Sequence, residues 1–217
     1  MGKNQNMKES KETFEKTATC RSCFKRFNYT AINYKDNKFY CSDKCMELYS
    51  DMEIRKIIPP KYWEIETDCK EFEELYGKGI FLSGKVGRGK TVLAASLAKK
   101  YIRNCVPVKW ISFPEFIMQI QNAYKKVTGK TPYDMAKEVS TFKGVLVIDD
   151  LGAEKLTDFV RQTAYYLINH REQYLLTTLI TSNYSLAEID EQLDGRISSR
   201  IKGMCECLNL TGKDRRG

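Results

Sequence analysis

The sequence predicts an α/β protein in which a parallel sheet is flanked by helices, with a small cysteine-rich module ahead of it. From Gly79 onward, short apolar runs alternate with stretches of helical periodicity, as expected for parallel strands joined by crossover helices. These runs are apolar nearly throughout, which is typical of strands buried on both faces. Upstream, four cysteines are crowded into residues 20–45.

Ten segments make up the expected sheet and its helices. The strands are GIFLSG (79–84), VPVKWISF (106–113), GVLVIDD (144–150), TTLITSN (177–183) and MCECLNL (204–210). The helices cover residues 90–104, 114–127, 133–142, 158–174 and, with a break, 186–202. Between the cysteines and the first strand lies a charged connector that contains Pro59-Pro60 and is expected to be extended there.

Composition narrows the class of protein. The chain has 217 residues and is 42% hydrophobic, which suits one packed domain plus a small module. No apolar run is long enough to span a membrane and the N-terminal residues are polar, so we expect a cytoplasmic protein with no membrane partner. The net charge of +8 favours an anionic partner, nucleic acid first, although solubility alone would also explain it. Since His170 is the only histidine, no Ser/His/Asp or Cys/His triad is expected.

The glycine-rich turn GKVGRGKT fits the pattern G-x-x-x-x-G-K-[ST]. It follows an apolar strand and precedes a helix, which is the context that distinguishes a phosphate-binding loop from a chance glycine turn. Glycines let backbone N–H groups surround phosphate oxygens, Lys90 can reach the β- and γ-phosphates of ATP, and the Thr91 hydroxyl can bind Mg²⁺. The expected nucleotide-binding residues are Gly84, Lys85, Val86, Gly87, Arg88, Gly89, Lys90, Thr91 and Val92.

Polar side chains end two of the later strands. Asp149 and Asp150 close GVLVIDD, where a carboxylate points into the crevice in which such sheets bind ligands. We expect Asp149 to bind Mg²⁺ and Asp150 to orient or deprotonate the attacking water. Asn183 ends the next strand and is a candidate partner for the γ-phosphate or that water, although Asn also commonly begins turns.

Taken together, these motifs resemble AAA+ ATPases, and more narrowly the group of DnaC, DnaI and IstB. GKVGRGKT resembles the group's Walker A motif, VLVIDDLG its Walker B motif and ITSNYSL its sensor 1. LDGRISSRI (193–201) resembles the arginine-finger segment, and LNLTGKDRR (208–216) resembles the segment that closes many short members. The resemblance covers roughly residue 58 to the C-terminus.

The resemblance implies an ATPase that assembles into a homo-oligomer. Arg200 would be the arginine finger for ATP held by a neighbouring subunit, with Arg196 one helical turn earlier in support. Hydrolysis would then be stimulated by assembly and by DNA. The chain departs from the usual pattern at Asp150, where most AAA+ proteins have Glu, and in the expected absence of a C-terminal helical lid with its sensor 2 arginine. Arg215 or Arg216 is the candidate substitute for that arginine.

Cysteine spacing predicts a zinc site. Cys20-x2-Cys23 and Cys41-x3-Cys45 can supply four thiolates tetrahedrally to Zn²⁺, whereas four unrelated buried thiols are the alternative. A module of this size cannot bury a self-sufficient core, so the metal would supply much of its stability. A helix expected after the last pair makes the module treble-clef-like.

These observations divide the chain into four parts and favour one function. The parts are a flexible tail (1–16), a zinc-binding module (17–50), a linker that begins the ATPase domain (51–78) and the AAA+ ATPase domain (79–217). The resemblance implies a loader of a replicative DNA helicase onto single-stranded DNA, with the zinc module engaging the helicase. The alternatives are an IstB-like ATPase that assists a DNA transposase and a nucleotide-dependent scaffold that hydrolyses little.

Overall fold

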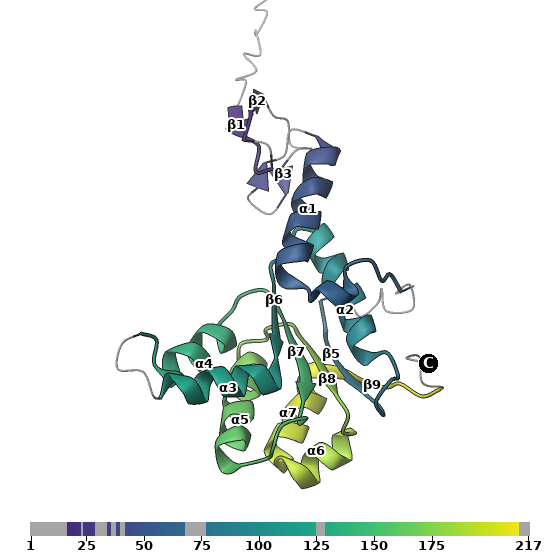
Figure 1. Cartoon of the computed structure of the whole chain (residues 1–217), viewed down its shortest axis with the longest axis vertical. Coiled ribbons are helices and arrows are strands. Elements are labelled where there is room, and N and C mark those ends of the chain that lie inside the picture. The colour runs from purple at the N-terminus through teal and green to yellow at the C-terminus, as the bar shows by residue number, and fades with distance from the viewer. Residues whose placement is uncertain are drawn as a thin grey trace, which may run out of the picture. The chain divides into compact units, whose positions relative to one another are not determined.

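The computed structural model describes residues 17–22, 24–28, 34–35, 38–39, 42–67, 77–124 and 129–212. The chain divides into two compact units, Met1–Asp51 and Met52–Gly217. The larger unit carries the sheet that the sequence predicts (Figure 1).

The smaller unit contains two short hairpins and the start of a helix. Strands β1 (Thr17–Thr19) and β2 (Arg26–Asn28) pair antiparallel, as do β3 (Tyr34–Lys35) and β4 (Lys38–Phe39). Helix α1 (Asp43–Ile57) begins in this unit and ends in the larger one. The β1–β2 turn is closed by the Cys20 N–H, which donates to the Lys25 carbonyl at 2.9 Å, and by the Phe24 N–H, which donates to the Cys20 carbonyl at 3.0 Å.

Five parallel strands form the sheet of the larger unit, in the order β6-β7-β8-β5-β9. Their bounds are β5 (Gly79–Ser83), β6 (Val108–Ser112), β7 (Val145–Leu151), β8 (Thr178–Ser182) and β9 (Cys205–Asn209). The predicted α/β fold with a parallel, helix-flanked sheet is therefore confirmed, and each strand lies where an apolar run predicts one.

The helices also agree with the periodicity. After the 3-10 turn η2 (Pro60–Tyr62) they are α2 (Lys90–Arg103), α3 (Phe113–Ala123), α4 (Pro132–Ser140), α5 (Asp158–Gln173), α6 (Leu186–Gln192) and α7 (Gly195–Met204). The expected break in 186–202 lies between α6 and α7, where the Asp194 side chain accepts from the Arg196 N–H and caps α7. Helix α3 ends at Ala123, before the predicted end at residue 127, and residues 125–128 lie outside the described part of the chain.

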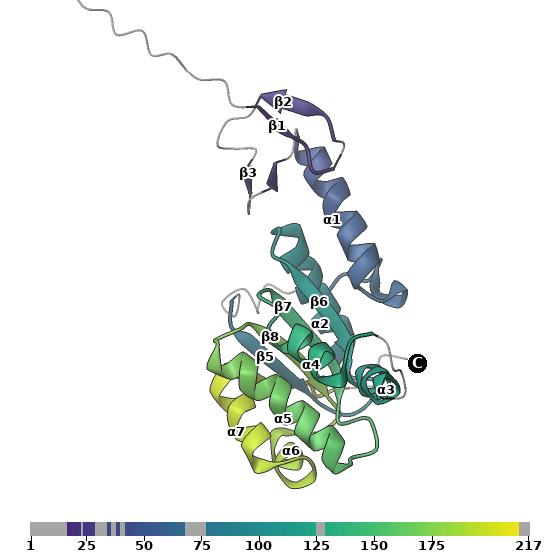
Figure 2. The ribbon, with the colours of Figure 1, turned by 90° about the vertical axis from the view of Figure 1, so that its left-hand side faces the viewer.

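Alternate residues of each strand enter different cores on the two faces of the sheet. Ile80 and Leu82 pack with α2 and with Ile54 and Ile58, whereas Phe81 between them packs in the cluster formed with α3, α5 and α7. Figures 1 and 2 show the layers, with α2 on one side of the sheet and α3 to α7 on the other. Burial on both faces explains the apolar runs of the central strands β5, β7 and β8, whereas the edge strands β6 and β9 are partly exposed and include Lys109 and Glu206.

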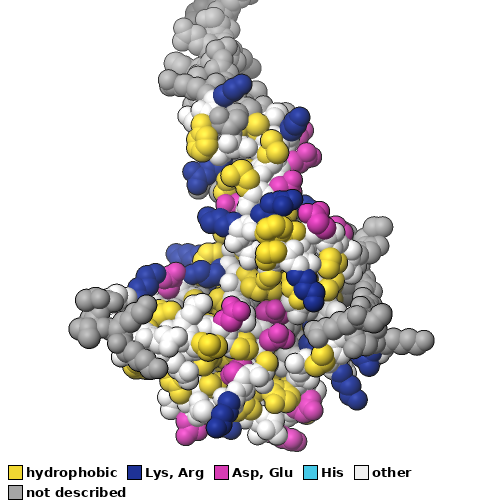
Figure 3. Space-filling model, in the orientation of Figure 1, with side chains coloured by type: hydrophobic (Ala, Val, Ile, Leu, Met, Phe, Trp, Pro, Cys, Tyr) yellow, Lys and Arg dark blue, Asp and Glu magenta, His cyan; other side chains and the backbone are white. Residues whose placement is uncertain are grey.

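The described surface carries charges of both signs. On the face seen in Figure 3, Lys and Arg side chains are scattered among Asp and Glu side chains. On the described part of this face, the basic side chains therefore form no single patch, although the chain as a whole has a net charge of +8. Among the helices described, none is long and apolar enough to cross a bilayer.

Candidate nucleotide site

Three neighbouring strands bring the predicted site residues to one edge of the sheet. Strand β8 lies between β5 and β7, and all three run parallel. The glycine-rich loop follows β5, the two aspartates lie near the end of β7, and Asn183 follows β8. The carboxyl ends of parallel strands meet at the same edge, which is where ligands bind in sheets of this kind.

The loop leaves the start of α2 open to an anion. Gly84 has a φ of 141°, and a Cβ there would lie 2.5 Å from the Leu210 carbonyl oxygen, so only glycine fits. Gly89 caps α2 in the left-handed conformation, with a φ of 83° and no side-chain hydrogen bond to the first turn. The N–H groups of that turn, which carry the positive end of the helix dipole, are therefore not covered by a capping side chain.

Lys90 lies inside this loop and is only 5% exposed. Its ammonium group donates to the Gly84 carbonyl at 2.7 Å, to the Lys85 carbonyl at 3.1 Å and to Asn183 Oδ1 at 2.7 Å. The last contact joins residues 93 positions apart in the sequence. The phosphate-loop lysine and the polar residue that follows β8 thus meet directly.

Asp149 is a buried carboxylate, 8% exposed, beside the same loop. It accepts a hydrogen bond from Thr181 Oγ1 at 2.6 Å and also bonds with the Thr91 side chain. Burial raises the pKa of Asp149 to about 6, and the charge of Asp150 acts in the same direction. The two hydroxyls and Lys90 favour the ionised form but do not offset burial.

Asp150 is held in an unusual backbone conformation. Its φ of 58° is left-handed, and the pairing of β7 with β8 shifts register between Ile148 and Leu151. Its N–H donates to Thr181 Oγ1 at 2.9 Å, a side-chain acceptor on β8. A bulge of this kind redirects a side chain, and here Asp150 lines the cavity at the phosphate loop.

That cavity has a volume of about 540 Å³. The loop and the polar strand ends line one part of it. Three further residues, Lys61, Tyr62 and Ile65, line it from η2 and the segment that follows η2. Sequence reasoning treated this segment as connector and missed its contribution.

The residues present fit a nucleoside triphosphate and Mg²⁺. An uncapped helix start with a buried lysine suits the phosphates. The buried Asp149 carboxylate and the Thr91 hydroxyl are oxygen donors of the kind that Mg²⁺ prefers, and the raised pKa of Asp149 means that this carboxylate lacks sufficient positive charge around it. A cation at that place would supply the missing charge.

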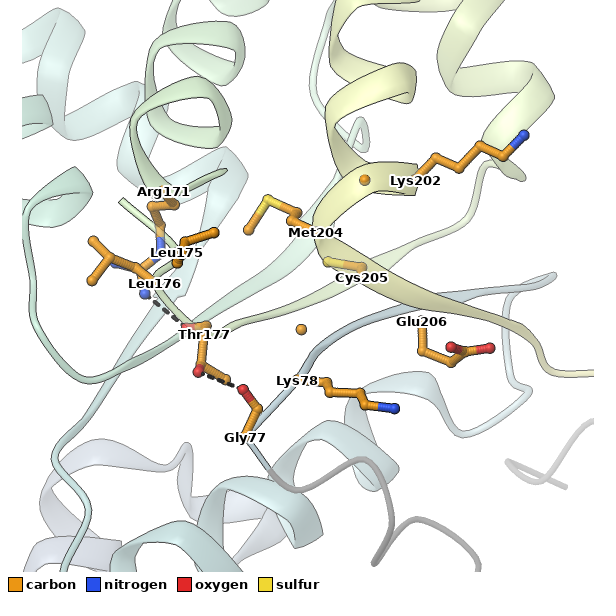
Figure 4. A pocket seen from close by; sticks show the side chains of 12 residues that line it. Gly77, Lys78, Arg171, Leu175, Leu176, Thr177, Lys202, Met204, Cys205 and Glu206 are labelled. Atoms are coloured by element: carbon orange, nitrogen blue, oxygen red, sulfur yellow. Dashed lines mark hydrogen bonds between the residues drawn. The ribbon is translucent and has the colours of Figure 1, made fainter. Parts of the chain in front are cut away.

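A second cavity, of about 430 Å³, lies at the amino-terminal ends of β5, β8 and β9 (Figure 4). Arg171 lines it and is fully buried. Its guanidinium donates to Thr178 Oγ1 and to the carbonyls of Ser140, Phe142, Gly144 and Thr177, so its donors are already used within the protein. This arginine ties loops to the sheet rather than offering a ligand site.

Arg196 and Arg200 are not brought to the cavity of their own chain. Arg196 pairs with Asp194 at 2.7 Å, and its guanidinium lies 4.7 Å from the centre of the Tyr165 ring. Arg200 pairs with Glu172 at 3.0 Å and lies over the same ring at 5.4 Å. Their predicted role concerns a neighbouring subunit, so these contacts within one chain leave it a prediction.

The predicted zinc ligands are only partly described. Cys20 is buried at the β1–β2 turn, and Cys45 lies in α1, where its N–H donates to Ser42. Cys23 and Cys41 lie outside the described residues, as do Arg215 and Arg216. Within the described ranges, no group of three or more His, Cys, Asp or Glu side chains could hold a metal ion.

Comparison with known proteins decides the family. The sequence model of the family described as IstB-like ATP binding protein matches residues 71–216, about two thirds of the chain. The chain belongs to this family. The IstB-like domain includes the glycine-rich loop, both aspartates and Asn183, and it begins after the segment that contains Tyr62 and Ile65.

Several relatives of this IstB-like chain are proteins of DNA replication. It is 29% identical over 153 residues to the replicative helicase loader DnaI of Bacillus subtilis (strain 168). This match covers 64% of this chain and 48% of that protein. The chain thus spans about half the length of this relative. Its structure resembles that of the DnaC helicase loader, with a TM-score of 0.59, 25% identity and coverage of 70% of this chain and 100% of the other. The structure of a putative primosome component from Streptococcus pyogenes serotype M3 is also similar, with a TM-score of 0.56, 27% identity and coverage of 74% of this chain and 93% of the other.

Thr181 is one site residue of this IstB-like domain that the sequence could have predicted but that was missed. Thr181 stands two positions before Asn183 on β8, and alternate residues of a strand share a face. The same argument that selected Asn183 therefore also points to Thr181. Nothing comparable in the sequence marked Tyr62 or Ile65.

Proposed function

We propose that the chain is an ATP-hydrolysing AAA+ protein that loads a replicative helicase onto single-stranded DNA. The observation that carries the proposal is the convergence of Lys90, Asp150 and Asn183 at one cavity of a domain whose relatives include helicase loaders. Asp149 is tied to the same cavity through its hydrogen bond with Thr91, which lines it. The basic net charge of the chain favours a nucleic-acid partner.

The chain's own residues divide the work of hydrolysis. The loop N–H groups and Lys90 bind and orient the phosphates, while Asn183 holds Lys90 or contacts the γ-phosphate. Asp150 orients or deprotonates the attacking water. Thr91 and Asp149 would hold Mg²⁺, which neutralises phosphate charge when bound. Arg200 of one copy completes the site of the next, so that hydrolysis depends on homo-oligomer assembly.

The first test is ATP turnover by the intact protein with no DNA, single-stranded DNA or duplex DNA. Loading predicts stimulation by single strands. Lys90→Ala is expected to lose ATP binding, whereas Asp150→Asn is expected to bind ATP and hydrolyse little. Equal turnover by Asp150→Asn and wild type would contradict the assignment of Asp150.

A second function is favoured by the family itself. The matching family is IstB-like, and an IstB-like ATPase that assists a DNA transposase is the alternative. It predicts stimulation by duplex DNA in the same assay. Absence of turnover under every condition, with ATP binding retained, would instead support the scaffold.

We also propose that Cys20, Cys23, Cys41 and Cys45 bind one zinc ion and that this module engages the helicase. The β1–β2 hairpin presents Cys20 on a tight turn, and α1 begins at Asp43, next to the second cysteine pair. Paired cysteines on a hairpin turn and at a helix start suit a tetrahedral thiolate site. Co-purification of the intact protein with a candidate helicase, with and without chelator, tests this part.

A further inference from the structure

Part of the nucleotide cavity comes from residues ahead of the family domain. Tyr62 and Ile65 line the cavity together with the loop residues Val86, Gly87 and Gly89. They precede residue 71, where the family match begins. Some contact must therefore hold this upstream segment against the domain.

Lys99 makes that contact from α2, the helix that begins at the phosphate loop. Its side chain is fully buried. The ammonium group donates to the carbonyls of Tyr62 at 3.1 Å, of Trp63 at 3.2 Å and of Ile65, and it pairs with Glu66 at 3.1 Å. A single side chain thus bonds to four of the five residues from 62 to 66.

The chemistry of this contact makes it specific. A buried ammonium is costly unless its donors are satisfied, and here three backbone carbonyls converge on it. Because these acceptors belong to the main chain, Lys99 fixes the path of the segment whatever its side chains are. Trp63 reinforces the same path, since its indole N–H donates to the Ile58 carbonyl at 2.7 Å.

We propose that Lys99 is a positioning residue that holds residues 62–65 as the nucleobase-binding wall of the cavity. The inference rests on the proposed ATP site. With phosphates at the loop, the lining left for the base includes Tyr62, Ile65 and Val92, which offer aromatic and apolar surface. Lys99 does not line the cavity and acts through the backbone of its wall.

Comparison of ATP with inorganic triphosphate separates this role from phosphate binding. Titration calorimetry on the intact chain with Mg²⁺ is expected to show that Lys99→Met weakens ATP binding roughly tenfold, because released carbonyls let the wall move away. Triphosphate affinity is expected to stay within about twofold, since the loop is untouched. Arg103→Met is the matched control: this residue lies one turn later on α2 and also pairs with Glu66, at 2.8 Å, but donates to none of the three carbonyls in the described contacts.

Two further variants keep the test decisive if Lys99→Met does not fold. Lys99→Arg keeps the buried charge but has a larger, planar head, and the same selective loss is expected in smaller degree. Ile65→Ala alters the wall at a side chain that is 38% exposed and should lower ATP affinity alone. Equal losses for both ligands, or unchanged ATP affinity in folded Lys99 variants, would overturn the inference. If wild type bound neither ligand, the proposed ATP site itself would fail, and this inference with it.

Discussion

Thr181 donates a hydrogen bond of 2.6 Å to the carboxylate of Asp149. The same hydroxyl accepts a hydrogen bond from the backbone N–H of Asp150 at 2.9 Å, so one buried group on β8 contacts both acidic residues near the end of β7. It acts where the two strands shift register and where Asp150 takes a left-handed φ. We therefore interpret Thr181 as the residue that fixes the bulge and, through it, the relative placement of the two carboxylates.

Replacing Thr181 by Val is expected to impair both stability and turnover. The substitution keeps the shape of the side chain but leaves the buried Asp150 N–H and the Asp149 carboxylate each short of one partner, which should lower the free energy of unfolding by about 1–3 kcal/mol. Turnover should fall roughly tenfold at saturating ATP because the acids lose their alignment. Urea unfolding and steady-state kinetics measure the two effects.

Thr181→Ser supplies the control for this prediction. Serine restores the hydroxyl, so kcat should return close to the wild-type value even if the lost methyl group lowers stability. If Ser and Val variants turned over ATP equally slowly, the hydroxyl would not be the group responsible.

The raised pKa of Asp149 predicts that the stability of the protein depends on pH in the absence of nucleotide and Mg²⁺. Its pKa is raised from 3.8 to about 6, mainly by burial, so the folded state holds this proton more tightly than the unfolded state does. Stability is therefore unaffected by this group below about pH 4 and falls as the pH rises towards 6. Above that pH the cost of the buried charge reaches up to about 3 kcal/mol.

Asp149→Asn removes that cost and should make the protein more stable while abolishing hydrolysis. The gain in the free energy of unfolding is expected to be largest near pH 7.5 and much smaller near pH 4.5. Urea unfolding in EDTA at both pH values measures it. A variant that is less stable than wild type at pH 7.5 would contradict the burial argument.

Much of this fold was predictable because local and tertiary signals agree. The apolar runs all lie on strands, of which the three central ones are buried, and the break between α6 and α7 coincides with the Asp194 cap. The placement of the glycine-rich loop, Asp149 and Asn183 at one edge was predictable because parallel strands bring their carboxyl ends together, while the roles of these residues stay predictions. The meeting of Lys90 with Asn183 follows from that topology.

Other features of the fold and of the site depend on tertiary contacts that no local sequence pattern predicts. Lys99 and Arg171 read as ordinary basic residues of surface helices, yet both are fully buried with backbone carbonyls as acceptors. Carbonyls are present at every residue, so the sequence does not mark which of them converge. The contribution of Tyr62 to the cavity wall could not be predicted from the sequence for the same reason, because the position of its backbone depends on the contact with Lys99.

Arg171 is expected to contribute strongly to stability and little to the chemistry. Its guanidinium bridges the loop before β7 to the start of β8, and Arg171→Met would leave four carbonyls with one donor fewer. The free energy of unfolding should fall by roughly 1–3 kcal/mol or more, because buried acceptors lose their donor. Arg161→Met, at a more exposed position of the same helix, should cost less than about 1 kcal/mol in the same denaturation experiment.

Zinc binding is expected to depend on the cysteine pairs and on no other cysteine. Cys20→Ser should lower the metal content from about one zinc per chain to near zero, and it should expose the remaining module to protease, because the metal supplies much of its stability. Cys207→Ser, at an exposed thiol of β9, is the control and should keep the zinc. Metal analysis after gel filtration, followed by limited proteolysis, measures both. Equal zinc content in the two variants would exclude Cys20 as a ligand.

Arg200→Ala is expected to retain ATP binding and lose assembly-dependent hydrolysis. In the single chain its guanidinium pairs with Glu172 and lies on the Tyr165 ring, so it does not reach its own nucleotide cavity. Turnover per subunit should rise with protein concentration in wild type and stay flat in the variant. Mixing gives the sharpest test: Lys90→Ala lacks a working phosphate loop but keeps Arg200, so it should restore turnover to Arg200→Ala subunits that hold ATP beside it. Failure of every mixing ratio to restore activity, with both variants folded and assembled, would remove Arg200 from the site of the neighbouring subunit.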